Sequence, residues 1–88
     1  MMQNTPDYYV EEIVKYVRCT AIIDPSQTIP LDQSLLAAGI VDSFGVIELL
    51  TFVETEFDLA IPDEDITAEN LGSIRKMATY VQQRKMAA

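Results

Sequence analysis

Apolar residues three and four positions apart mark three stretches of this chain, a spacing that places a hydrophobic stripe along one side of a helix. The three stripes are Val10, Ile13, Val14 and Val17; Val46, Leu49, Leu50, Val53 and Phe57; and Ile74, Met77, Ala78 and Val81. Each helix must bury its stripe against the others, and 88 residues suffice for one small core. We therefore predict an all-α fold, a small antiparallel four-helix bundle that fills residues 1–88 as a single domain.

Capping residues and helix breakers set the expected bounds of the helices. The sequence Thr-Pro-Asp at 5–7 is typical of a helix start and predicts a first helix over about 6–19. The second helix is expected to begin at Ser43, and Ser73 is expected to cap the last one. A brief helix over about 65–70 lies between them, so the bundle has three long helices and one short helix.

A long loop is predicted between the first and second helices. Residues 20–42 contain prolines and a glycine, which interrupt any long regular element. A loop of this length in a small domain is unusual unless it is functional or packed. We expect a short helical turn at 33–38 and packing of the loop on the core through its apolar residues, namely Ile23, Ile29, Leu31, Leu35, Leu36 and Ile40.

The charge of the chain is strongly acidic and unevenly distributed. Six basic and fourteen acidic residues give a net charge of −8, and no Lys or Arg occurs from Cys19 to Ile74. Such a surface repels nucleic-acid phosphates and anionic lipid headgroups, so we exclude nucleic acid and membranes as partners. It attracts basic patches on proteins, although simple solubility is the alternative explanation.

Several other classes of function are excluded by residues that the chain lacks. There is no His, the commonest general base, so a Ser-His-Asp triad is impossible. Cys19 is the only cysteine and forms neither an internal disulfide nor a metal cluster; we expect it to be buried or half-buried in the first helix. The acidic run at 63–65 lacks the spacing of a calcium loop and predicts a solvated turn, so no metal site is expected.

The location of the protein is also predicted from missing signals. The N-terminal residues lack the basic start and apolar run of a signal peptide, and no stretch approaches the roughly 20 apolar residues of a membrane span. We therefore predict a cytoplasmic protein.

Ser43 is an isolated hydroxyl at the start of the strongly apolar second helix. Either Ser43 or Asp42 suits the N-cap position, and whichever caps the helix leaves the other free. A helix N-terminus carries unpaired N–H groups and a partial positive charge, which together favour an attached phosphate. Ser43 is thus the candidate modification site.

The second helix also has a partly apolar second face. Phe44, Ile47 and Thr51 lie at i, i+3 and i+7, with Glu48 beside them. One interpretation is that Phe44 and Ile47 pack against the long loop. The other is that this face is a docking surface that mixes apolar and acidic groups.

The segment GIVDSFGVIELLTFVETEFDLAIPDED, residues 39–65, resembles the central motif of the acyl and peptidyl carrier proteins. The similarity consists of an Asp-Ser pair at the start of the second helix, the Glu48-Leu49 pair, the Glu-x-Glu-Phe at 54–57 and the Ile-Pro-Asp at 61–63. The order of helices fits this family along nearly the whole chain.

This resemblance implies that Ser43 receives 4′-phosphopantetheine from coenzyme A through a separate, magnesium-requiring phosphopantetheinyl transferase. The thiol of that group would carry an acyl or aminoacyl cargo as a thioester, so the domain itself would not be an enzyme. Asp42 would help to position the transfer. Partner enzymes, which are a loading enzyme and downstream synthases or transferases, would recognise the exposed residues Phe44, Ile47, Glu48 and Thr51.

Departures from the fatty-acid carrier pattern narrow the expected role. Phe44 and Gly45 stand where those carriers usually have Leu and an acid. In this respect the sequence is more similar to discrete, stand-alone carriers of polyketide or nonribosomal-peptide biosynthesis. A D-alanyl or fatty-acid carrier is the alternative, and an unmodified acidic helical interaction module is the alternative of another class. Phe52, Val53 and Phe57 are expected to fill the bundle, which favours a short or polar cargo held outside a monomeric protein.

Overall fold

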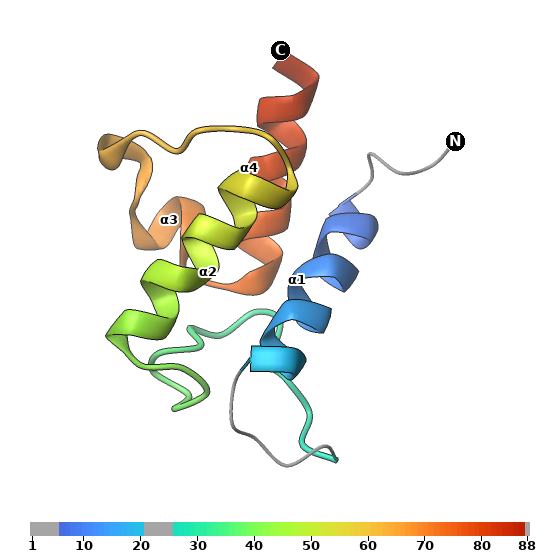
Figure 1. The fold of residues 1–88 in the computed structure, drawn as a ribbon, viewed down its shortest axis with the longest axis vertical. Helices are drawn as coiled ribbons and strands as arrows, with labels where there is room; N and C mark the ends of the chain where they lie inside the picture. Colours follow the sequence, from blue (N-terminus) through green and yellow to red (C-terminus); the bar gives the residue numbers. More distant parts are fainter. Residues whose placement is uncertain (1–5, 21–25, 88) are drawn as a thin grey trace.

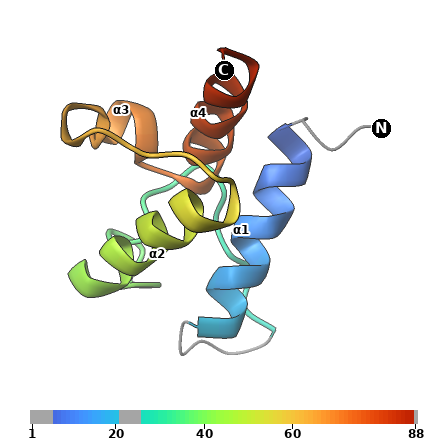
Figure 2. The ribbon, with the colours of Figure 1, turned by 45° about the horizontal axis from the view of Figure 1, so that its top comes forward.

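The computed structural model describes residues 6–20 and 26–87, and these ranges contain helices and no strand (Figure 1). The elements in chain order are α1 (Pro6–Thr20), α2 (Ser43–Glu56), the 3-10 helix η1 (Asp63–Asp65), α3 (Ala68–Leu71) and α4 (Ile74–Ala87). Figures 1 and 2 show α1 antiparallel to both α2 and α4, with the start of α1 near the end of α4. The all-α bundle with three long helices and one short helix is confirmed.

The core forms where the predicted stripes face one another. Ile13 of α1, Leu49 and Val53 of α2, and Ile74 and Val81 of α4 are each at most 1% exposed. At the edge of α2, Val46 and Leu50 are only half-buried. Aromatic pairs extend the core: the Tyr9 and Phe57 rings meet edge to face at 5.0 Å, and the Tyr16 and Phe52 rings stack at 4.2 Å. Bulky rings thus occupy the space between α1 and α2.

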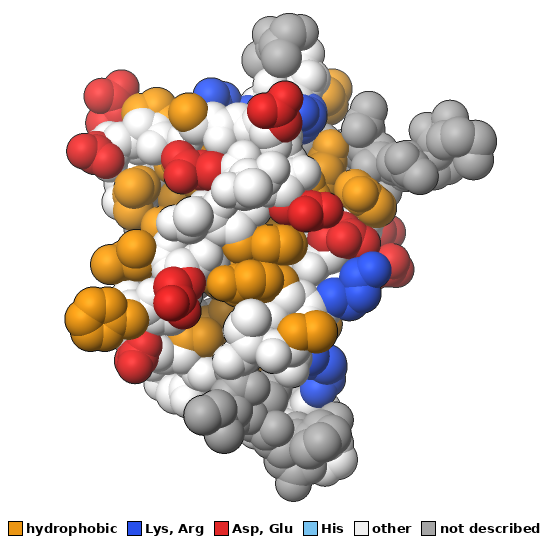
Figure 3. Space-filling model, viewed as in Figure 1, with side chains coloured by type: hydrophobic (Ala, Val, Ile, Leu, Met, Phe, Trp, Pro, Cys, Tyr) orange, Lys and Arg blue, Asp and Glu red, His pale blue; other side chains and the backbone are white. Residues whose placement is uncertain are grey.

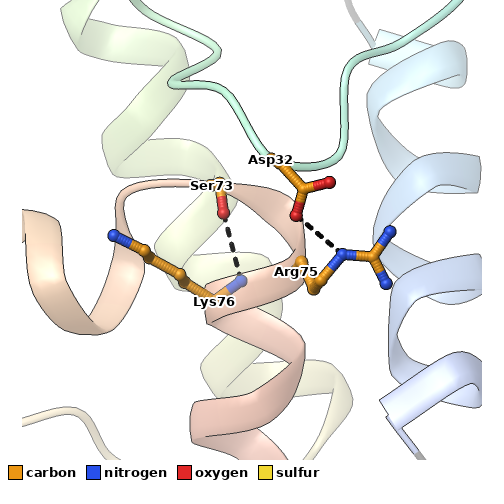
Figure 4. Close-up of polar contacts among 4 residues, drawn as sticks. All are labelled: Asp32, Ser73, Arg75 and Lys76. Atoms are coloured by element: carbon orange, nitrogen blue, oxygen red, sulfur yellow. Dashed lines mark hydrogen bonds and ion pairs between the residues drawn. The ribbon is translucent and has the colours of Figure 1, made fainter.

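The long loop is packed against the bundle, as predicted, and it is fastened to the first turn of α4 (Figure 4). The Arg75 backbone N–H donates to Leu31 O at 2.9 Å, and its side-chain Nε pairs with Asp32 Oδ1 at 2.7 Å. Leu35 and Ile40 are 3% and 7% exposed. Of the predicted anchors, Leu36 is wrong, because its side chain is 50% exposed, and Ile23 lies outside the described residues.

One prediction for the loop is confirmed and one for α1 is wrong. The expected turn at 33–38 is present as a single hydrogen-bonded turn, in which the Ala38 N–H donates to Ser34 O at 2.9 Å, and it ends at Gly39, whose φ is 77°. Cys19 is exposed rather than buried. It lies two residues after Val17, off the buried stripe of α1, so it faces solvent.

The expected third helix at 65–70 is divided into η1 and α3. Thr67 is extended (φ −133°, ψ 162°), and its Oγ1 accepts the backbone N–H of Asn70 at 3.2 Å, so α3 starts only at Ala68. Ser73 caps the first turn of α4 as predicted, with its Oγ accepting the Lys76 N–H at 3.2 Å (Figure 4).

The connection after α2 is closed by side chains from two helices. Glu54 Oε2 accepts the Ile61 N–H at 2.8 Å, and Lys85 Nζ of α4 donates to Phe57 O at 2.8 Å. The acidic and Ile-Pro positions of the quoted segment therefore have a structural role in turning the chain. Neither a metal-binding cluster nor a helix suited to crossing a membrane occurs within residues 6–20 and 26–87.

Candidate functional site: the first turn of α2

Asp42 is the residue that caps α2. Its backbone is extended (φ −99°, ψ −172°), its Oδ1 accepts the Gly45 N–H at 2.8 Å, and its carbonyl accepts the Val46 N–H at 3.0 Å. These bonds satisfy donors that the start of a helix otherwise leaves unpaired. The choice between Asp42 and Ser43 as the cap is thus decided in favour of Asp42, and Ser43 is the first helical residue.

The Ser43 side chain is exposed, and its hydroxyl makes no hydrogen bond to any residue that the structure describes. The backbone N–H groups of Ser43 and Phe44 lie in the first turn, where a helix supplies no partner for them. A phosphodiester on the Ser43 oxygen would therefore be close to a partial positive charge and to free donors. The residues of this turn fit a phosphopantetheine group.

Gly45 is a feature of the site that sequence reasoning did not explain. A Cβ at this position would lie 2.9 Å from Cβ of Val41, the residue that ends the long loop. Real Cβ atoms essentially never approach so closely. Gly45 therefore allows the loop to pass directly against the first turn of α2; a glycine inside a helical pattern was the only available signal.

The outer face of α2 carries both apolar and acidic side chains. Phe44 is 77% and Ile47 is 61% exposed, which contradicts the interpretation that they pack against the loop. Glu48 and Thr51 are exposed on the same side, and the Thr51 hydroxyl donates to Ile47 O at 3.1 Å. Figure 3 shows hydrophobic and acidic side chains next to one another over α2.

Positive charge is kept away from this face. All six basic residues belong to α1 and α4, and none occurs from Ser26 to Ile74. Two of them are paired with acids, Lys15 with Glu12 at 3.0 Å and Arg75 with Asp32 at 2.7 Å. The start of α2 is thus an acidic surface.

Two grooves flank α2. The larger, of about 680 Å³, lies between α2, the end of α1 and the loop, and is called here the α1–α2 groove. The smaller, of about 290 Å³, lies between α2, α3 and the loop and is called the α2–α3 groove. Asp42 and Phe44, which flank Ser43 in the chain, both line the α1–α2 groove. The candidate attachment residue is therefore next to the mouth of the larger groove.

Residues 12–81 match the family described as "Phosphopantetheine attachment site". The match covers most of the chain, so this protein belongs to that family. Its members are carriers rather than enzymes, and membership implies a covalently attached 4′-phosphopantetheine. An exposed serine in a capped first turn, on a helical bundle, agrees with that class.

Similar curated proteins are carriers of several kinds. The chain is 44% identical over 46 residues to the acyl carrier protein of Bdellovibrio bacteriovorus, covering 52% of this chain and 56% of that protein. It is 34% identical over 55 residues to the D-alanyl carrier protein of Lactococcus lactis, covering 62% and 70%. It is 46% identical over 39 residues to aminoacyl carrier protein 2 of Bradyrhizobium diazoefficiens, covering 44% of each. The matches thus span between about two fifths and two thirds of the chain, and little more than half of the Bdellovibrio protein.

Proposed function

We propose that the Ser43 Oγ is the attachment atom for 4′-phosphopantetheine and that the chain is an acyl or aminoacyl carrier. The observation that supports this proposal is the exposed Ser43 hydroxyl beside the Asp42 cap, which bonds to none of the described residues. The attached group supplies a terminal thiol that holds the cargo as a thioester. The first turn of α2 contributes its unpaired N–H groups, which stabilise a negative charge at Ser43.

Asp42 is proposed as a positioning residue in the loading reaction. Its carboxylate fixes the backbone of the first turn through the Gly45 N–H, and this turn presents the Ser43 hydroxyl to a phosphopantetheinyl transferase. Coenzyme A is the donor of the group: the Ser43 oxygen forms the new bond to phosphorus, the pyrophosphate bond breaks and adenosine 3′,5′-bisphosphate leaves, and the transferase, with its magnesium ion, takes up the serine proton.

The docking surface for partner enzymes is proposed to comprise Phe44, Ile47, Glu48 and Thr51. Exposed aromatic and aliphatic side chains offer apolar contact area, while the acidic surroundings speed encounters with basic partners. The partners are the transferase, a loading enzyme and a downstream synthase or transferase.

A substitution at Phe44 tests this surface. Phe44→Ala is expected to lower kcat/KM for loading by the transferase about fivefold or more, since removal of an interface anchor costs upwards of about 1 kcal/mol. Met86→Ala is the matched control, because Met86 is similarly exposed (74%) but lies at the far end of α4. Equal kcat/KM for both variants and the wild type would show that Phe44 is not part of the docking surface.

For the cargo, we propose a discrete carrier in specialised biosynthesis of the polyketide or nonribosomal-peptide type. Phe44 and Gly45, in place of the pattern of fatty-acid carriers, support this choice. D-alanyl transfer is the second candidate, favoured by the similarity to the D-alanyl carrier of Lactococcus lactis. Incubation of the loaded arm with a D-alanine ligase, D-alanine and ATP distinguishes them: an added alanyl mass supports the second candidate.

Attachment at Ser43 is tested by intact mass. Incubation with coenzyme A, Mg²⁺ and a broad-specificity phosphopantetheinyl transferase is expected to add one phosphopantetheine to the wild type and none to Ser43→Ala. Ser34→Ala, which alters another exposed serine, is the control and should be loaded normally. Because Ser43 makes no capping bond, the free energy of unfolding of Ser43→Ala should lie within about 0.5 kcal/mol of the wild-type value. An unmodified wild type, or a modified Ser43→Ala, would contradict the proposal.

A further inference from the structure

A further groove lies along α1, away from the site at the start of α2. It has a volume of about 470 Å³, lies between α1 and the loop residues 28–31, and is called here the α1–loop groove. Its floor is aliphatic: Val10 and Ile29 are buried, and Val14 and Leu31 are half-buried. At 3.6 residues per turn, this side of α1 faces away from the side that lines the α1–α2 groove.

Charged side chains line this groove in a definite order. Glu11 lies nearer the start of α1, and Arg18 lies about 10 Å further along the helix axis. Lys15 lies between them and is paired with Glu12 at 3.0 Å. Figure 3 shows the same order, with acidic side chains over the first part of α1 and basic side chains over the second part. The groove thus has a negative end, a positive end and an aliphatic floor.

This order of charges is complementary to itself when a second copy lies antiparallel. If two α1 helices lie side by side about a two-fold axis between Val14 and Lys15, Glu11 of each copy faces Arg18 of the other. Val14 of each copy then contacts the aliphatic stem of Lys15 from the other. A parallel pairing would instead place like charges together, which costs free energy. We propose that the α1–loop groove is the interface of a two-fold symmetric dimer with a second copy of this chain.

The dimer is expected to be weak and to leave the α2 site open. Each copy contributes mainly one helix and the edge of a loop, which is typical of a small, transient interface. The net charge of −8 on each copy opposes association, but at roughly 0.15 M ionic strength this repulsion is screened beyond about 8 Å. The groove faces away from α2, so Ser43 remains accessible in both copies. The monomer expected from the sequence is the alternative.

Sedimentation equilibrium at roughly 0.15 M salt measures the Kd of dimerisation. We expect Glu11→Arg to raise this Kd about tenfold or more, because two contacts between Arg side chains replace two between Glu and Arg. The effect of net charge is in the opposite direction, since this substitution makes the chain less negative. Glu56→Arg changes the net charge equally at the exposed end of α2, so it is the matched control and should not raise the Kd.

Exchange of the two charges tests the pairing itself. Arg18→Glu alone should also raise the Kd, and it removes the hydrogen bond from Arg18 to Gln27 O at 3.0 Å as well. A one-to-one mixture of the Glu11→Arg and Arg18→Glu chains should form a heterodimer about as readily as the wild type dimerises, because one chain then has Arg at both positions and the other has Glu. The variant with both substitutions should recover the homodimer.

The outcomes separate this inference from the carrier proposal. A wild type that sediments as a monomer up to about 0.5 mM would refute the dimer. A Kd that Glu11→Arg leaves unchanged, or that Glu56→Arg raises equally, would overturn the assignment to this groove, and failure of both charge exchanges would refute the antiparallel pairing. Intact mass after incubation with the transferase is independent of these results: every variant should gain one phosphopantetheine, and a lack of loading in all of them would contradict the carrier role alone.

Discussion

Substitution of Asp42 separates the two roles that this residue has at the start of α2. Asp42→Asn retains an oxygen that accepts the Gly45 N–H but loses the charge, whereas Asp42→Ala loses both. A cap hydrogen bond contributes about 1 kcal/mol, with a range of roughly 0.5–2, and a charge at the helix N-terminus about 0.3–1 kcal/mol. We therefore expect Asp42→Asn to lower the free energy of unfolding by about 0.3–1 kcal/mol, and Asp42→Ala to lower it by roughly a further 0.5–2 kcal/mol.

Urea unfolding followed by circular dichroism measures this difference, and each kcal/mol corresponds to a change in Tm of roughly 4–8 °C for a domain of this size. Thr67→Ala, which removes the cap of α3, is the control for loss of a cap away from Ser43. If the cap positions Ser43, loading by the transferase slows more in Asp42→Ala than in Asp42→Asn and is normal in Thr67→Ala. Equal stability of the two Asp42 variants would refute the capping bond, and equally slow loading would show that the charge matters instead.

Two further predictions concern the packing of α2 and the tyrosines of the core. Gly45→Ala should lower the free energy of unfolding measured in urea, because the added Cβ would meet Val41. This is expected even though Ala favours a helix over Gly by about 1 kcal/mol. A stabilised variant would contradict this packing. Burial is the main cause that raises the pKa of Tyr80, and the hydrogen bond to Asp65 is the next. Burial also raises the pKa of Tyr9. The folded state therefore holds these phenolic protons more tightly than the unfolded state, so the contribution of the two tyrosines to stability should be fully present below about pH 10 and be lost as the pH rises above it. Tyr80→Phe should reduce this alkaline slope without abolishing it, since Tyr9 remains, and an unchanged slope would be the contrary result.

The helices were predictable because each has a clear apolar stripe and recognisable ends. Leu49 and Val53 are buried as the spacing required, and Ser73 caps α4 as its position suggested. The identity of the α2 cap was not predictable, since Asp and Ser favour this position equally. Only the backbone geometry, with Asp42 extended and Ser43 helical, decides between them.

The loop and the surface around the site were harder to predict, because they depend on contacts between residues far apart in the chain. The Asp32–Arg75 pair joins the loop to α4 across 43 positions, and no local pattern indicates it. The close approach of Val41 to Gly45 is likewise a tertiary contact. Exposure of Phe44 could not be deduced from spacing, because a partly apolar second face is compatible with either packing or solvent.

The separation of charge between the helices affects how the protein meets other molecules. All the Lys and Arg residues lie on α1 and α4, while the charged residues of α2 and of its connections are all acidic. A molecule with this distribution experiences a torque in the field of a basic enzyme, so it turns while the two are still separated by solvent. Collisions then occur preferentially on the side of the bundle that carries α2 and η1, and less often on the side of α4.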